Sequence, residues 1–229
     1  MLTHGNISRL LIFLSGLYRG STASLYETQI LARITSGERE WIERKCEHCR
    51  FTRLGNNAEY ELSERGRIIA KEYVCNGDVQ LAFRSILRTY IEEVRPIWAY
   101  KFPAGREEAF SAMSADEIKC FEEAGLGRGA IGDDVIRWWD QIAALFRNPY
   151  ENELLKIGRE GERFTIQYEL NRIGASPKWV SIESNYAGYD VLSKESSVSN
   201  DRRLIEVKAT HKNIRDAEFF ISRNEWETA

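Results

Sequence analysis

The chain has 229 residues, 43% of them hydrophobic, and carries a formal net charge of -3 with a pI near 5.8. This is enough apolar material for two or three small domains, and the charge excludes a protein that coats nucleic acid through one large basic field, although a local basic groove stays open. Without an eighteen-residue apolar run or a signal peptide, we expect a cytoplasmic protein that makes no contact with a membrane.

Residues 1–75 begin with helical patterns. Apolar residues recur at helical spacing over residues 7–17, which predicts an amphipathic helix, and a second short helix is expected over residues 25–34. Thr35 stands three residues before Glu38, the spacing of a capping box, so a third helix is expected to open there.

Two short strand-like runs, residues 50–54 and 59–62, predict a β-hairpin, and Ser63 begins a further helix. Three helices followed by a hairpin resemble a winged helix-turn-helix, so residues 1–75 are predicted to bind double-stranded DNA. The basic residues expected to contact it, all around the third helix and the hairpin, are Arg39, Arg44, Lys45, Arg50 and Arg53.

Residues 76–148 are predicted to be helical, with one apolar stripe interrupted by Pro96 and a helix capped by Ser114 and Glu117. Tryptophans and leucines at this spacing usually form core, so we interpret the segment as a helical linker or a dimerisation region. A homodimer or a partner subunit is therefore possible, and Pro149 marks the next boundary.

Four cysteines, Cys46, Cys49, Cys75 and Cys120, are too few and too unevenly spaced for a disulfide framework, so we expect reduced thiols. Cys46 and Cys49 have the C-x-x-C spacing of zinc ligands with His48 between them. Because a second ligand pair is missing nearby, free thiols are the preferred interpretation.

Residues 149–229 change to one helix followed by strands. The helix is expected to begin at residue 154, and Gly158 and Gly161 within it indicate a close packing partner because glycine destabilises a helix. The remaining elements are expected to be strands at 179–182, 189–192, 203–209 and 219–221 and a last helix capped by Ser222 with Glu225.

Side chains alternate across a strand, so Glu206 and Lys208 share one surface. Asp190 on the neighbouring strand adds a second carboxylate, and such a cluster is costly unless a divalent cation neutralises it. Mg²⁺ or Mn²⁺ suits these hard ligands and supports phosphodiester hydrolysis. Asp190, Glu206 and the Val207 carbonyl are the expected metal ligands, with Lys208 positioning the attacking water and Glu162 orienting a metal-bound water or a second cation.

The same residues carry a family resemblance. Gly158-Arg159-Glu160-Gly161-Glu162, Gly188-Tyr189-Asp190, Ile205-Glu206-Val207-Lys208-Ala209 and Asn224-Glu225-Trp226 with Ala229 resemble the protein NO VEIN C-terminal-like domain, a branch of the PD-(D/E)XK nuclease superfamily. The resemblance covers roughly residues 150–229 and implies a Mg²⁺-dependent nuclease with a central mixed sheet, common in restriction and anti-phage proteins. Tyr189 replaces the proline of the superfamily's name. Such domains usually add a further strand after the position of Ala229, so we expect the chain to be truncated or its sheet to be completed by a partner.

Together these features predict an α+β protein: a winged-helix-like domain over 1–75, a helical linker over 76–148 and an α/β nuclease-like domain over 149–229. The leading interpretation is a Mg²⁺-dependent DNA endonuclease of the restriction or anti-phage type. The alternative is a non-catalytic DNA-binding regulator or sensor that uses a nuclease-like fold for docking. Lys212 and Arg215, with His211, form a phosphate-contacting patch or merely a solvated face.

Overall fold

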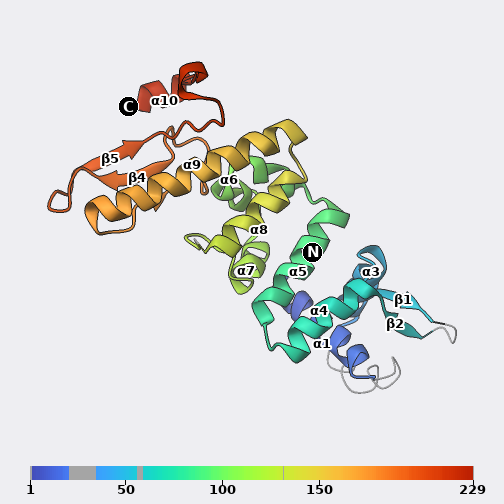
Figure 1. The fold of residues 1–229 in the computed structure, drawn as a ribbon. Helices are drawn as coiled ribbons and strands as arrows, with labels where there is room; N and C mark the ends of the chain where they lie inside the picture. The colour runs from blue at the N-terminus through green and yellow to red at the C-terminus, as the bar shows by residue number, and fades with distance from the viewer. Residues whose placement is uncertain (1, 21–34, 56–58, 131, 229) are drawn as a thin grey trace. The chain divides into compact units, whose positions relative to one another are not determined.

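The computed structural model describes residues 2–20, 35–55, 59–130 and 132–228. The chain divides into two compact units, Met1–Ile97 with Met113–Ile131, and Trp98–Ala112 with Gly132–Ala229. In the described parts the protein is mostly helical with two small antiparallel sheets, which confirms the predicted α+β class (Figure 1). Within these ranges no helix combines the length and the apolar character needed to cross a membrane.

The first unit contains five described helices and a hairpin, in the order predicted for its start. They are α1 (His4–Tyr18), α3 (Ser36–His48), β1 (Thr52–Leu54), β2 (Tyr60–Leu62), α4 (Glu64–Cys75), α5 (Val79–Val94) and α7 (Ala115–Glu123). The two strands pair antiparallel, as expected for the hairpin. The predicted helix over residues 25–34 lies outside the described residues.

Local capping explains where the helices of this unit begin. At α3 the Thr35 side chain accepts from the Glu38 backbone N–H while the Glu38 carboxylate accepts from the Thr35 N–H, so the predicted capping box is confirmed. Ser114 and Glu117 make the same box at α7. Ser63 caps α4 and also donates to the Phe51 carbonyl, which ties the hairpin to the helix that follows it.

The core of this unit forms where α1 meets α4. Ile7, Leu10 and Leu14 of α1 are fully buried, as their helical spacing predicts, and Ile69 of α4 is buried with them. The order of elements matches the winged-helix pattern, and that identity stays a prediction.

The helices predicted as a linker are divided between the two units. The helix α5 ends at Val94, just before Pro96, and belongs to the first unit with α7. The 3₁₀ helix η2 (Ile97–Ala104) lies mainly in the second unit, together with α6 (Arg106–Ser111) and α8 (Asp133–Ala144). There the rings of Phe102, Phe110 and Phe146 and of two tryptophans form an aromatic core, which includes edge-to-face contacts of Phe102 and Phe110 with Trp139.

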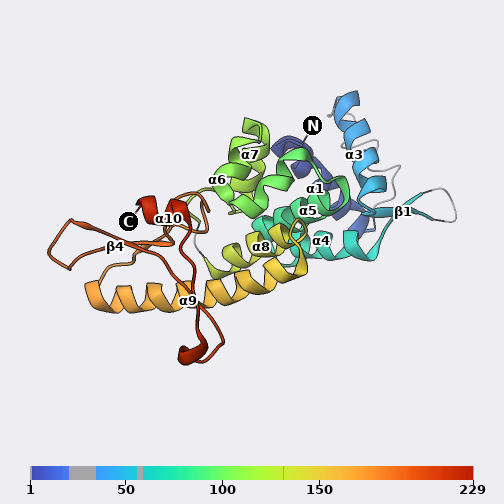
Figure 2. The same cartoon turned by 90° about the horizontal axis from the view of Figure 1, so that it is seen from above.

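The second unit continues with a long helix beside a three-stranded sheet (Figures 1 and 2). Its elements are α9 (Pro149–Ile173), β3 (Lys178–Trp179), β4 (Val191–Lys194), β5 (Arg202–Ile205), η3 (Ile214–Asp216) and α10 (Arg223–Thr228). The sheet order is β3-β4-β5 and both pairings are antiparallel, so the predicted mixed sheet is wrong for the described residues. The helix α9 packs against β4.

The helix α9 begins earlier than predicted. Asn148 caps it by accepting from the Glu151 N–H at 2.9 Å, and Pro149 occupies the first helical position, where a missing N–H costs nothing. The proline therefore opens the helix that was expected from residue 154.

Four predicted strands differ from the structure. The strand expected at 189–192 runs from Val191 to Lys194, so Asp190 lies just before it and not within it. The strand expected at 179–182 ends at Trp179, because the Glu183 N–H turns back to the Val180 carbonyl. The strand expected at 203–209 ends at Ile205, because the Val207 N–H donates to a carboxylate and not to a neighbouring strand. Residues 219–221 are exposed and form no strand with any described segment.

Candidate active site

Asp190 lies immediately before the first residue of β4, Val191. Its backbone N–H donates to the Ile205 carbonyl at 2.9 Å, and its own carbonyl accepts from the N–H groups of Val180 (2.7 Å) and Ser181 (3.1 Å). Its carboxylate Oδ2 accepts from the Val207 N–H at 2.8 Å. Asp190 thus fixes the end of β5 through its backbone. Its carboxylate also holds the segment that follows β5, at Val207.

Glu206 and Lys208 share one surface, as the alternation of a strand predicts. Lys208 Nζ lies 2.6 Å from Glu206 Oε1 and 3.0 Å from Glu225 Oε1. Glu225 is held by a reciprocal cap in which its carboxylate accepts from the Ser222 N–H at 2.8 Å and its own N–H donates to Ser222 Oγ at 3.3 Å. The sequence assigned Glu225 only to this cap, and its place in the Asn224-Glu225-Trp226 motif was the signal for a second role.

The charges of this cluster perturb one another. Burial raises the pKa of Glu206 to about 7, the negative charge of Asp190 adds to the rise, and the hydrogen bond from Lys208 opposes it. Burial also raises the pKa of Asp190, against the hydrogen bond from the Val207 N–H. For Lys208 burial alone would lower the pKa, but the hydrogen bonds to Glu206 and Glu225 raise it. Two carboxylates with raised pKa values beside a lysine are typical of a functional site.

A hollow of about 350 Å³ borders the cluster. It is lined by Ser181, Ser184, Asn185, Tyr186, Gly188, Tyr189, Asp190, Glu206, Ser222, Asn224 and Glu225. Three of these side chains are carboxylates and none is lysine or arginine. A phosphate can therefore approach the carboxylates only if a bound cation offsets their charge.

Glu162 lies in a buried network beneath the sheet. Its Oε2 accepts from Arg159 Nη1 at 2.8 Å, from Ser181 Oγ at 2.6 Å and from the indole N–H of Trp179. Arg159 also pairs with Asp140. Glu162 does not line the hollow, but Ser181 does, so Glu162 supports the hollow's wall through that hydroxyl. Its predicted contact with a metal-bound water stays a prediction.

The glycine prediction holds for one of the two positions in α9. A Cβ at Gly161 would lie 2.7 Å from the Ala209 Cβ and 3.1 Å from Val207 Cγ1, so the glycine lets the segment after β5 pack directly on the helix. Gly158 has only Glu162 Oε1 near it, at 3.9 Å, which is an ordinary van der Waals distance, so it has no close packing partner.

The donor set fits a hard divalent cation. Asp190 and Glu206 supply carboxylate oxygens at adjacent positions, and Mg²⁺ usually binds to one or two carboxylates while it keeps several waters. Among the described residues, no three histidine, cysteine or acidic side chains converge as a ready-made metal cluster. Two carboxylates and solvent are thus the ligands that this site provides, with the Val207 carbonyl as the further ligand that the sequence predicts.

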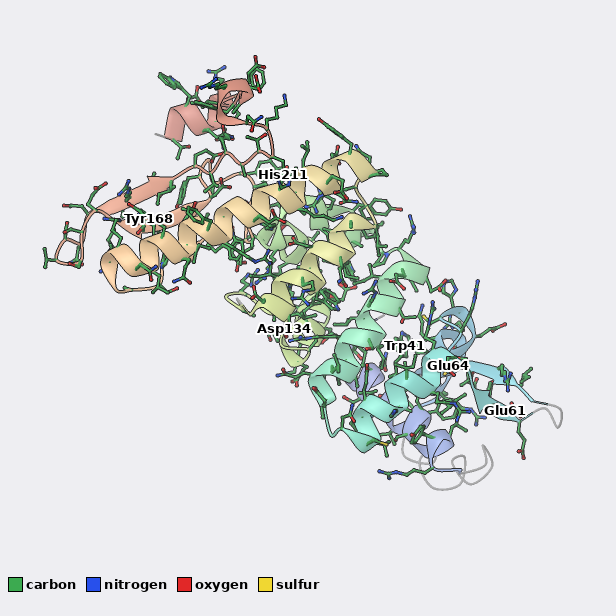
Figure 3. All side chains as sticks on the ribbon, in the orientation of Figure 1. Trp41, Glu61, Glu64, Asp134, Tyr168 and His211 are labelled. Carbon is green, nitrogen blue, oxygen red and sulfur yellow. The ribbon has the colours of Figure 1, made fainter. Side chains whose placement is uncertain are left out.

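The basic residues predicted to contact DNA in the first unit are largely paired with acids. The ion pairs are Arg39–Glu43 at 2.9 Å, Arg44–Glu40 at 3.0 Å and Arg53–Glu61 at 3.0 Å. Lys45 lies over the Tyr90 ring, and Arg50 follows α3 with a positive φ of 55°. Figure 3 shows Glu61 on the hairpin, where it pairs with Arg53. Exposed pairs of this kind are weak and exchange partners readily, so DNA contact stays a prediction.

His211, Lys212 and Arg215 follow the carboxylate cluster on an exposed segment. The Lys212 N–H donates to Thr210 Oγ1 at 3.1 Å, which shapes the turn before η3. The choice between a phosphate-contacting patch and a solvated face stays open.

The four cysteines are free thiols, as predicted. Cys46 and Cys49 are buried, and burial raises the pKa of both, to about 11 for Cys49. Among the residues that the structure describes, these two cysteines are not part of a group of three or more side chains able to hold a metal, which favours free thiols over a zinc site. His48 points elsewhere and donates to the Glu93 carbonyl at 3.1 Å.

The second unit thus contains a small antiparallel sheet flanked by helices. Two acids and a lysine, Asp190, Glu206 and Lys208, gather where β5 ends. Residues 161–229 match the family model described as Protein NO VEIN, C-terminal, which confirms the predicted resemblance for this segment. The match contains Glu162, Asp190, Glu206 and Lys208 but spans less than half of the chain. No curated protein and no solved structure matches the chain.

Proposed function

We propose that the second unit is a divalent-metal-dependent nuclease that hydrolyses phosphodiester bonds in DNA. The observation that carries the proposal is the cluster at the end of β5, where Asp190 and Glu206 adjoin and Lys208 lies 2.6 Å from Glu206. The raised pKa values of both carboxylates support it, because burial disfavours their charged forms and a bound cation would favour those forms again. The family match over residues 161–229 is consistent with it.

Each residue has a defined task in this proposal. Asp190 and Glu206 hold the cation at the edge of the hollow, and the Val207 N–H keeps the Asp190 carboxylate oriented through a 2.8 Å bond. A bound Mg²⁺ would supply Lewis acidity toward the phosphoryl oxygen and lower the pKa of its water. Lys208 places a positive charge beside the attacking water and the developing charge.

Glu225 pairs with Lys208 in addition to Glu206, so the ammonium has two carboxylate partners. When a cation draws Glu206 toward itself, Glu225 keeps Lys208 in place. We assign Glu225 as a positioning residue, which acts through the lysine and not on the substrate.

The second candidate is a non-catalytic DNA-binding regulator that keeps the fold for docking. The observation that favours it is the direct pairing of Lys208 with both Glu206 and Glu225, which satisfies the lysine without any substrate. In this alternative the cluster only stabilises the junction between β5 and α10.

Incubation of the full chain with supercoiled plasmid DNA, with and without Mg²⁺ or Mn²⁺, separates the two candidates. The nuclease proposal predicts nicked or linear products only with the metal. It also predicts that Asp190→Asn abolishes them, while Glu153→Gln, an exposed acid elsewhere on α9 that pairs with Lys156, leaves them unchanged. If plasmid DNA and single-stranded DNA are both bound but both stay intact with either metal, the regulator takes the place of the enzyme.

A further inference from the structure

The hollow beside the carboxylate cluster has a chemistry that differs from that of a phosphate site. Asp190, Glu206 and Glu225 are its charged lining residues, and the remaining lining residues are uncharged, with no lysine or arginine among them. Under the proposed function, on which this inference rests, the scissile phosphate lies with the cation at the carboxylates. The rest of the hollow is therefore suited to an uncharged part of the substrate.

Tyr186 presents an exposed aromatic ring at this hollow. Its side chain is 69% exposed. Its backbone is held on both sides, since its N–H donates to Ser184 Oγ at 3.2 Å and its carbonyl accepts from Asn224 Nδ2 at 3.1 Å. A tyrosine has few rotatable bonds, so an exposed ring on a held backbone is a suitable platform for stacking. Tyr189, which is half-buried, lines the same hollow.

Two amide side chains add hydrogen-bond acceptors. Asn185 Nδ2 donates to the Pro103 carbonyl at 2.9 Å and Asn224 Nδ2 donates to the Tyr186 carbonyl, so the orientation of each amide is fixed. The Oδ1 atoms of Asn185 and Asn224 accept no hydrogen bond from the residues that the structure describes. Nucleobases carry N–H and amino donors on their edges, which match such acceptors.

We propose that this hollow holds a single unstacked nucleobase, so that the substrate is single-stranded or locally unpaired nucleic acid. In a duplex the faces of the bases are covered by their neighbours, and an aromatic side chain cannot stack on them until a base leaves the helix. A volume of about 350 Å³ is at the lower end of small-ligand pockets and suits one nucleoside unit.

Binding of a fluorescent single-stranded DNA oligonucleotide and of the same sequence as a blunt duplex, measured by anisotropy in Ca²⁺, tests the proposal without requiring hydrolysis. Because the first unit is predicted to bind the duplex, the expected signature of the hollow is binding that depends on Tyr186 with the single strand and does not depend on Tyr186 with the duplex. Tyr186→Ala should weaken single-strand binding about 5- to 150-fold, the range expected for the loss of one base–aromatic stack. Tyr186→Phe keeps the ring and should bind like the parent.

Tyr168→Ala is the matched control, because this tyrosine is similarly exposed, at 58%, but lies on α9 and does not line the hollow (Figure 3). It should leave binding unchanged. The inference is overturned if Tyr186→Ala binds the single strand like the parent, or if it weakens duplex binding as much as single-strand binding. Binding that depends on Tyr186, without cleavage under any metal, would retain the nucleobase inference and reject the nuclease. Metal-dependent cleavage that does not change in Tyr186→Ala would retain the nuclease and reject the nucleobase inference.

Discussion

Gly161→Ala is the substitution that most sharply tests how α9 positions the site. In a helix interior, alanine is more favourable than glycine by about 1 kcal/mol, so on propensity alone the change stabilises the protein. At position 161, however, the new Cβ would lie 2.7 Å from the Ala209 Cβ, well inside the roughly 3.5–4.0 Å at which carbon atoms pack best. Overpacking of this kind typically costs about 1–3 kcal/mol.

The matched control is Gly158→Ala, one turn earlier in the same helix. Its Cβ would meet only Glu162 Oε1, at the ordinary contact distance of 3.9 Å, so this variant keeps the gain in helix propensity. Guanidinium denaturation followed by tryptophan fluorescence should therefore place Gly161→Ala below Gly158→Ala by about 1–3 kcal/mol.

The same substitution reaches the site through the backbone. Displacing Val207 and Ala209 from α9 weakens the bond from the Val207 N–H to Asp190, so Gly161→Ala should also lower the affinity for Mn²⁺ measured by calorimetry. Gly158→Ala should bind Mn²⁺ like the parent. If both variants are stabilised equally and bind Mn²⁺ equally, the packing of this segment on α9 is refuted.

Two further predictions concern pH and the first unit. Because the pKa of Glu206 is raised to about 7, the folded, metal-free protein favours the neutral Glu206 carboxyl. The stability that the neutral carboxyl contributes is lost as pH rises through about 7. A cation requires the charged form, so the rise in melting temperature with added Mn²⁺ should grow from pH 6 to 8 in the parent; an equal growth in Glu206→Gln would contradict this. Gly66→Ala should unfold at markedly lower denaturant than Gly37→Ala, because a Cβ at Gly66 would meet the Phe51 carbonyl oxygen at 2.1 Å, whereas one at Gly37 meets nothing within 4 Å. Equal midpoints would exclude this contact between the hairpin and α4.

Features set by neighbouring residues were predictable from the sequence. The capping boxes at Thr35 and Ser114 depend on a spacing of three residues, and the structure has both. Glu206 and Lys208 share a surface because they are two residues apart, and this holds although β5 has already ended at Ile205. Such features depend on local geometry, which the sequence specifies directly.

Features set by contacts between distant residues were not predictable. The end of β5 depends on a bond between the Val207 N–H and the Asp190 carboxylate, which are seventeen residues apart. Glu225 was assigned to a helix cap, and its second role at Lys208 depends on how α10 folds back toward β5. The family resemblance implied a mixed sheet, and this prediction was wrong because β3, β4 and β5 pair antiparallel.

The most direct test of the central claim is the single-turnover rate of Mg²⁺-dependent DNA cleavage by Lys208→Ala. Lys178→Ala, which removes an exposed lysine from β3, is the control. A lysine that stabilises the developing charge is worth about 2.7–4 kcal/mol in the transition state, so Lys208→Ala should lose a hundredfold or more in rate while it binds DNA like the parent. A lysine that only pairs with Glu206 and Glu225 contributes at most about 1 kcal/mol, to stability and not to rate. Cleavage by Lys208→Ala at the rate of Lys178→Ala would contradict the assignment of Asp190, Glu206 and Lys208 as a catalytic centre.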